Sequence, residues 1–277
     1  MAASWWKLGL ALGVGAAFCS LVPSCADNNL TIFIRQMQGL VAPQCTVTND
    51  PTAIKISGGS LDLALTNSYV AFPLIGNQLI ARGDVRLSRA EPNRVVLEGA
   101  EVRLLNPDGS ERVPAFTVTA TGTIDPTASS DPAYGVTSVE VIPASIGVQL
   151  RDGLLAEGVA SRAIHAEVRV FGKTLGGTDV ETGPYVMPID LCFGCSVSFP
   201  TVDPTTNLPN CGVVEGEGTG QVEICRAGQD RTTRCSLCAG TVPLCTPCLT
   251  DAECGGMVGS LDPTQPSRCN TATRRCQ

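Results

Sequence analysis

Hydrophobic and polar residues alternate along most of residues 30–191. In the clearest run, residues 116–124, threonines at 117, 119, 121 and 123 alternate with less polar side chains. A period of two is typical of a β-strand with one buried and one solvent-facing side. Residues 61–66, 100–105 and 164–171 alternate in the same way, and no window of comparable length has a helical stripe. The pattern therefore predicts an all-β domain.

Turn sequences separate these runs at short intervals. Residues 106–109 read Asn-Pro-Asp-Gly, in which Pro presets φ and Gly accepts a positive φ. Roughly eight or nine short strands joined by such turns are typical of an antiparallel two-sheet sandwich of immunoglobulin or fibronectin-like type. A small barrel is the alternative. We expect the domain to cover residues 27–191.

The composition changes after Leu191. Residues 192–277 contain 11 of the 14 cysteines, together with many Gly, Pro and Thr residues and few large aliphatic ones. Such a segment buries too little apolar surface to offset its chain entropy, so covalent cross-links must hold it. Each closed loop contributes about 2–4 kcal/mol. We therefore expect residues 192–277 to form an irregular, disulfide-rich tail.

The N-terminus has the features of an export signal, residues 1–26. Lys7 precedes an apolar run over residues 8–22, which is shorter than the roughly 20 residues of a membrane-spanning helix. Residues 22–25, Val-Pro-Ser-Cys, resemble a lipobox that would lead to lipidation of Cys25, although Pro23 is unusual there. Cleavage after Ala26 by an ordinary signal peptidase is the alternative.

The cysteine count supports export independently. Cys19 lies in the discarded segment, and Cys25 is either lipidated or cleaved off; without these two an even number remains, and an even count in an exported chain indicates disulfides. The tail holds an odd number of these cysteines, so complete pairing requires Cys45 to bridge to the tail, and we expect Cys192 or Cys195 as its partner. The full predicted set is Cys45, Cys192, Cys195, Cys211, Cys225, Cys235, Cys238, Cys245, Cys248, Cys254, Cys269 and Cys276.

A zinc site and a thioredoxin-like redox site are the alternatives to disulfides for these cysteines. Cys235, Cys238, Cys245 and Cys248 have a C-x2-C-x6-C-x2-C spacing that could close a zinc site in a reducing compartment. Cys192 and Cys195 form a C-x-x-C motif, but the sequence after it does not begin a helix, as a thioredoxin-like site would require. We expect disulfides, with no metal and no cofactor.

Few residues suggest catalysis. The single histidine, His165, falls on the polar side of its predicted strand, and no G-x-S-x-G nucleophile motif is present. A carboxylate pair such as Asp125 and Asp131 leaves a glycosidase open as a third hypothesis. The net charge of −7 and the absence of a basic run argue against nucleic acid and against an electrostatic membrane patch.

Two stretches, residues 66–79 and 183–195, resemble uncharacterised cysteine-rich lipoproteins of myxobacteria. The end of the chain, Cys248-x5-Cys254-x14-Cys269-x6-Cys276, is similar to cysteine-rich modules of the Dickkopf type. The first resemblance implies a cell-envelope location and brings no known activity. The second implies an extracellular binding module.

These observations favour a non-enzymatic exported protein, either an outer-membrane lipoprotein or a secreted one, that acts as a surface interaction or structural module. Its partner would be an envelope protein or a glycan, and a lipid anchor would be its only membrane contact. The alternative is a secreted carbohydrate-binding module. Sugar sites often use exposed aromatic rings, and outside the signal the chain has no Trp and three tyrosines, Tyr69, Tyr134 and Tyr185.

The export hypothesis predicts the intact mass of the protein purified from its native envelope. We expect a chain that begins at Cys25 and carries acyl groups, and whose mass rises on reduction by two hydrogens for each disulfide. An N-terminus at Asp27 without acyl mass would contradict the lipoprotein assignment.

Overall fold

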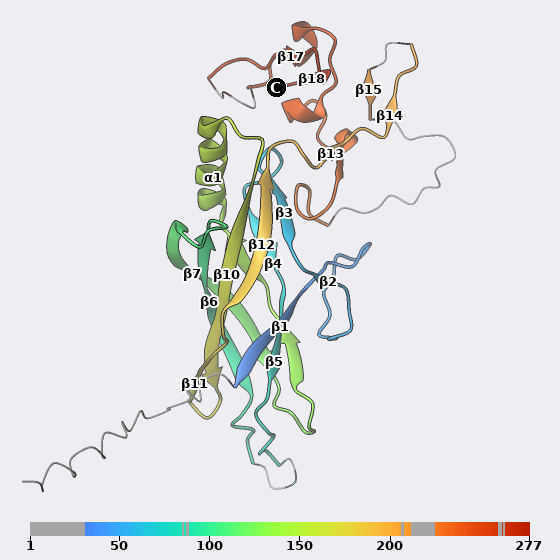
Figure 1. Ribbon diagram of the computed structural model, residues 1–277. Helices are drawn as coiled ribbons and strands as arrows, with labels where there is room; N and C mark the ends of the chain where they lie inside the picture. The colour runs from blue at the N-terminus through green and yellow to red at the C-terminus, as the bar shows by residue number, and fades with distance from the viewer. Residues whose placement is uncertain are drawn as a thin grey trace, which may run out of the picture.

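The computed structural model describes residues 31–84, 86, 89–205, 208–211, 225–259, 262 and 264–277. The predicted signal peptide, residues 1–26, and the lipidation site Cys25 lie outside the described residues. Within them, most of the β domain belongs to two sheets (Figure 1).

The smaller of these sheets has four strands in antiparallel pairs. Their spatial order is β2 (Lys55–Ile56), β1 (Ile32–Gln38), β5 (Pro73–Asn77) and β8 (Ala133–Val136).

The larger sheet has six strands, and a separate short pair accompanies it. The order is β3 (Gly59–Asp62), β12 (Tyr185–Cys192), β10 (Ser161–Thr174), β6 (Val95–Leu105) and β7 (Glu111–Ile124), with β11 (Asp179–Glu181) also beside β10. The separate pair is β4 (Tyr69–Ala71) and β9 (Val139–Ile142).

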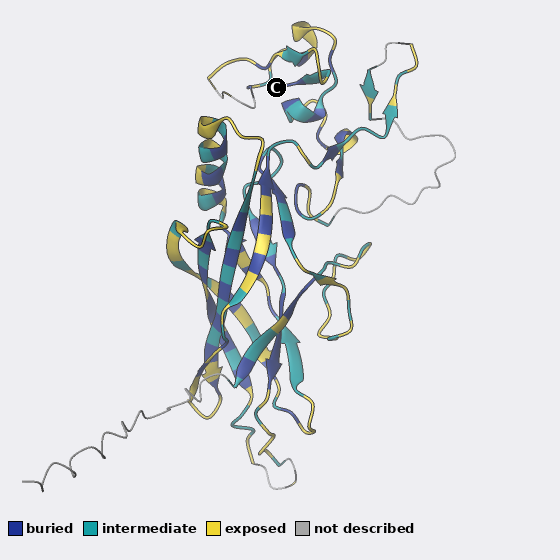
Figure 2. Ribbon diagram, in the orientation of Figure 1, coloured by how far each residue is buried: buried dark blue, intermediate teal, exposed yellow. Residues whose placement is uncertain are grey.

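The long strands follow the alternation read from the sequence. On β7 the four threonines at 117, 119, 121 and 123 are exposed, whereas Ala120 and Ile124 are buried. On β10 every second residue from Ile164 to Val170 is fully buried. The same alternation of buried and exposed positions is visible along β12 (Figure 2). These strands form because β-branched and small apolar residues fill one side of a pleated surface.

One hydrophobic core joins the sheets. Its buried side chains come from both of them and include Ile32 and Ile75 of the four-stranded sheet and Val102 and Val168 of the six-stranded sheet. The two sheets approach each other at β7 and β8, where Thr137, just after β8, donates a hydrogen bond from Oγ1 to the carbonyl oxygen of Thr121 at 2.8 Å. The all-β prediction is confirmed, while the immunoglobulin-like strand arrangement stays a prediction.

Two details differ from the sequence expectation. First, β3 runs parallel to β12, so the six-stranded sheet is not wholly antiparallel. Second, residues after β9 form a helix, α1 (Ala144–Glu157), which ends at Gly158 in the left-handed conformation. The helix was not predicted because it buries only Gly147, Leu150 and Leu154, a stripe too narrow to stand out from the sequence.

Where the structure describes the tail, its elements are all short and are gathered at the end of the β domain where β12 ends (Figure 1). Its paired strands are β13 (Val197–Ser198) with β16 (Thr233–Arg234), β14 (Thr201–Val202) with β15 (Pro209–Asn210), and β17 (Cys269–Asn270) with β18 (Arg275–Cys276). Its 3₁₀ helices are η1 (Cys235–Leu237), η2 (Pro243–Cys245) and η3 (Asp251–Cys254).

Cysteines take the place of large aliphatic residues inside the tail. One buried cluster joins Val197 to Cys235, Cys238 and Cys245, and a second joins Cys248, Cys254 and Cys276. The predicted disulfide-rich tail is therefore confirmed. In the described part of the chain, no helix has both the length and the apolar character needed to cross a membrane.

The shared core predicts a large cost for removing a buried side chain. Leu104→Ala, on β6, should lower the free energy of unfolding by about 2–5 kcal/mol, because it leaves a cavity at a fully buried position. Leu175→Ala is the matched control, since Leu175 is 57% exposed, and should change the stability by less than about 0.5 kcal/mol. Urea denaturation measures both, and equal effects would contradict the placement of Leu104.

Candidate functional site

All twelve predicted cysteines form disulfides. The pairs are Cys45–Cys225, Cys192–Cys195, Cys211–Cys235, Cys238–Cys245, Cys248–Cys269 and Cys254–Cys276. The four cysteines with zinc-like spacing are distributed over three bridges, so they do not converge on one metal.

Cys45 bridges the β domain to the tail, but its predicted partner was wrong. Cys192 and Cys195 pair with each other, and Cys45 pairs with Cys225, which is 180 residues away in sequence. Closeness to the last strand therefore did not identify the partner. The tail instead returns to the β domain at residues 225–234, and this return creates the candidate site.

The returning segment docks against β3 by backbone hydrogen bonds. The amide of Asp62 donates to the carbonyl oxygen of Gly228 at 2.7 Å, and the amide of Asp230 donates to that of Ser60 at 3.0 Å. Leu61 and Gln229 form an antiparallel bridge between these two bonds. The tail thus extends the six-stranded sheet at the edge of β3.

The side chain of Gln229 extends the contact to β4. Its Oε1 accepts a hydrogen bond from the amide of Val70 at 3.1 Å, and its Nε2 donates to the carbonyl oxygen of Val70 at 2.8 Å. The side-chain amide thereby pairs with β4 as a neighbouring backbone would. The segment is thus joined to β3 by the backbone of the residues on either side of Gln229, and to β4 by the Gln229 side chain.

Asp230 completes the docking through a buried tyrosine. The Tyr69 hydroxyl, on a side chain with no exposed surface, lies 3.0 and 3.1 Å from the two carboxylate oxygens of Asp230, to which it donates. The same carboxylate accepts from the amide of Ser60 and from Nε2 of Gln229. Burial, and then the negative charge of Asp230, raise the pKa of Tyr69 far above its ordinary value.

A second carboxylate fixes the beginning of the tail. Asp62 is 1% exposed, and its Oδ1 accepts from the amides of Ala64 and Gly194 at 3.0 and 2.7 Å. Its Oδ2 accepts from both the amide and the hydroxyl of Ser196, each at 2.8 Å. Four donors replace the water that this charge loses on burial. The loop after β12 is consequently tied to the end of β3.

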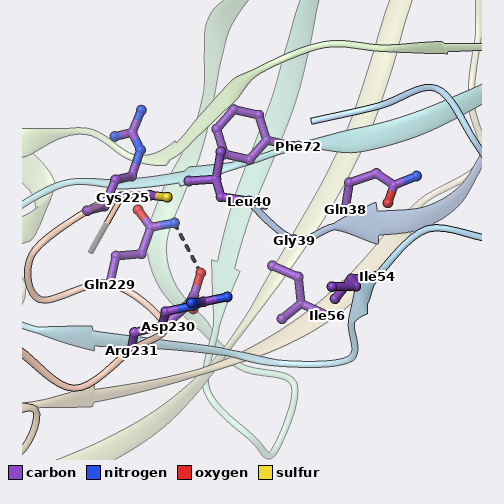
Figure 3. A pocket seen from close by; sticks show the side chains of 11 residues that line it. Gln38, Gly39, Leu40, Ile54, Ile56, Phe72, Cys225, Gln229, Asp230 and Arg231 are labelled. Atoms are coloured by element: carbon purple, nitrogen blue, oxygen red, sulfur yellow. Dashed lines mark hydrogen bonds between the residues drawn. The ribbon is translucent and has the colours of Figure 1, made fainter. Parts of the chain in front are cut away.

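Between the returning segment and β1 lies a hollow of about 110 Å³, which we call the junction hollow (Figure 3). Its walls come from both parts of the chain. The lining residues are Gln38, Gly39, Leu40, Ile54, Ile56 and Phe72 of the β domain and Cys225, Arg226, Gln229, Asp230 and Arg231 of the tail. A second hollow of about 220 Å³ lies between α1 and the tail, next to Phe193 and Val242.

The junction hollow combines an apolar wall with two cations. Ile54 is 62% exposed, and the guanidinium of Arg226 lies 5.9 Å from the centre of the Phe72 ring. Neither Arg226 nor Arg231 has an ion pair with a carboxylate in the described ranges. Such a surface can accept an apolar group that carries a negative charge or a hydrogen-bond acceptor.

The other residues considered from the sequence lie elsewhere. His165 is half-buried on β10. It lies on the same side of the strand as Glu167, whose carboxylate forms an ion pair with Arg103 at 3.3 Å. Asp125 pairs with Arg94 at 2.6 Å on the surface. The residues that build the site, Asp62, Gln229 and Asp230, were not predicted, because each is a single polar residue with no motif around it.

The chain was compared with protein families, with curated proteins and with solved structures. No family model and no curated protein matches the chain. One solved structure to which the chain is similar is a protein from Archaeoglobus fulgidus, with 12% identity and a TM-score of 0.26. The match covers 45% of this chain and 85% of that chain.

The Tyr69–Asp230 contact predicts a dependence of stability on alkaline pH. Because the folded state holds the Tyr69 proton above the ordinary pKa of 10.0, the contribution is complete below that pH and is lost as pH rises above it, by about 1.4 kcal/mol per pH unit. Tyr69→Phe should remove this part of the alkaline loss. It should also lower the stability at neutral pH by about 1.5–3 kcal/mol, the range for a hydrogen bond to a charged group.

Urea unfolding at neutral and at alkaline pH measures both effects. Tyr134→Phe is the control, because the Tyr134 hydroxyl lies at the surface next to Arg35. This control should retain the alkaline loss of wild type. An unchanged alkaline slope in Tyr69→Phe would contradict the buried contact.

Proposed function

We propose that this protein is a non-enzymatic exported surface module that binds another cell-envelope component through the junction hollow. The observation that carries the proposal is that the two walls of the hollow belong to separate parts of the chain and are fixed to each other. Cys45–Cys225, Gln229 and Asp230 all lie at this boundary. A surface held in one shape binds without an ordering cost.

Export is part of the proposal. Complete pairing of the cysteines outside the signal is what an oxidising compartment allows, and reducing compartments disfavour it. A lipid on Cys25 would tether the protein to the outer membrane, and this tether would be its membrane contact. The β domain then serves as a rigid base that holds the tail and the hollow away from the lipid.

The lining of the hollow suggests the chemistry of the partner. Arg226 and Arg231 favour an acidic group, and Ile54 and Phe72 favour an apolar side chain next to it. An envelope protein that presents an acidic residue beside an apolar one fits both requirements. Aromatic and arginine side chains are also those that contribute most to binding energy at interfaces.

The binding proposal is tested by changing the hollow without changing the fold. Ile54→Arg replaces the apolar side chain at an exposed position of the wall with a longer, charged one that cannot pack in the same way against the partner's apolar group, and should weaken binding to the envelope partner by about tenfold or more, or 1.4 kcal/mol. Arg231→Glu should weaken it similarly by reversing one charge.

The partner is first identified by photo-crosslinking from residue 54 in intact cells, and its affinity for the purified variants is then measured. Leu175→Arg is the control, since Leu175 is similarly exposed, at 57% against 62% for Ile54, but lies outside the lining of the hollow. Affinities unchanged by Ile54→Arg and Arg231→Glu would refute the hollow as the contact site.

A carbohydrate-binding module is the second candidate. The observation in its favour is that the Phe72 ring, the amides of Gln38 and Gln229 and the Asp230 carboxylate line the same hollow. Aromatic rings with a few convergent polar groups are typical of small-ligand sites. A glycan array with wild type and Ile54→Arg separates the candidates: binding at micromolar affinity that the variant loses would favour the sugar.

A further inference from the structure

A cluster of two sulfurs and one carboxylate lies where β3 and β12 end. Cys192 is the register partner of Asp62 in the parallel β3–β12 pair, and Cys195 follows in the next turn. The sulfurs of Cys192 and Cys195 are bonded to each other, and one carboxylate oxygen of Asp62 lies within 4.8 Å of both. Two thiolates and a carboxylate are a donor set that zinc accepts.

Hydrogen bonds hold this cluster in place without help from the disulfide. The amides of Gly194 and Ser196, on either side of Cys195, both donate to Asp62. The carbonyl oxygen of Cys192 accepts from the amide of Leu63 at 2.8 Å. Breaking the sulfur–sulfur bond therefore leaves the backbone of both cysteines fixed.

The Cys192–Cys195 disulfide is also the one that the fold needs least. Its cysteines are 3 residues apart, whereas the other bridges join cysteines separated by 7 to 180 residues. The entropy that a disulfide removes from the unfolded chain increases with loop length, so this bridge contributes the least. Cys195 is moreover the only one of the twelve paired cysteines that falls in the exposed class.

We propose that the reduced form of this loop is a zinc site formed by Cys192, Cys195 and Asp62, with solvent as the fourth ligand. A dithiol reductant supplies two electrons and two protons: its own thiols become a disulfide, the Cys192–Cys195 bond breaks, and each sulfur becomes a thiol. Zn²⁺ then displaces both protons as it binds the two thiolates.

Charge explains why the two thiols would lose their protons only when a cation binds. Two thiolates beside the Asp62 carboxylate would place three negative charges in a largely buried site, and no cationic side chain pairs with Asp62 within the described segments. A divalent cation cancels two of the three charges. To bind it, Asp62 needs to release one of its four donors.

A second sulfur cluster does not meet these conditions. Cys248, Cys254 and Cys269 also lie close together, but they belong to two bridges whose cysteines are 21 and 22 residues apart. Cys248 and Cys254 have no exposed surface and form the centre of the C-terminal lobe, the part of the tail that packs around the cluster of Cys248, Cys254 and Cys276. Opening those bridges would remove the core of the lobe.

The test uses the mature full-length protein under mild phosphine reduction. Alkylation and peptide mass mapping should show Cys192 and Cys195 open while the other five bridges persist. Native mass spectrometry should then detect one Zn²⁺ per chain, and Cd²⁺ should give the ultraviolet thiolate-to-metal absorption band. The proposal is overturned if this dithiol form binds no metal, or if the bridge opens only when the others do.

Variants separate metal binding from loop structure. Cys195→Ser and Asp62→Asn should each lower the Zn²⁺ affinity of the reduced protein by about tenfold or more, and unchanged affinity in Cys195→Ser would sink the proposal. Ser196→Ala is the matched control, because it removes one Asp62 hydrogen bond but no ligand, and should bind as wild type. Neither outcome bears on the junction hollow, which has no residue in common with this cluster.

Discussion

The architecture depends on the docking of tail residues 228–230 onto the edges of β3 and β4. In its described residues the tail has two small buried clusters built largely from cysteines, so its place on the β domain depends strongly on directional bonds. Three consecutive residues make these bonds. Gly228 and Asp230 pair with the backbone of β3, the side chain of Gln229 pairs with the backbone of β4, and the carboxylate of Asp230 accepts a hydrogen bond from Tyr69. The Cys45–Cys225 bridge then keeps the two parts together even when these bonds open.

Two carboxylates, the buried Asp62 and the half-buried Asp230, divide this task between them. Asp62 holds the point at which the chain leaves the β domain, and Asp230 holds the point at which it returns. Both are satisfied by hydrogen-bond donors, with no cation paired to either in the part of the chain that the structure describes. Hydrogen bonds to a carboxylate are directional and also stabilise its charge. Two single residues can therefore orient a large irregular segment.

The same two anchors place the two regions to which we assign function. The junction hollow exists because Asp230 and Gln229 bring Arg226 and Arg231 against Phe72 and Ile54. The sulfur cluster exists because Asp62 draws the turn after β12 back onto β3. We propose that one region meets a partner with an apolar and cationic surface, and that the other binds a metal through the thiolates formed when its bridge is reduced.

The sequence by itself determined the class of fold and the need for a covalent link. Alternation along residues 116–124 and 164–171 is a local property of strands, and the odd number of tail cysteines requires Cys45 to reach the tail. Only the tertiary structure decided that the partner is Cys225, that Asp62 is buried and that residues 144–157 are helical. Those outcomes depend on which distant segments meet, and a pattern of neighbouring residues carries no information about contacts made across 180 positions of chain.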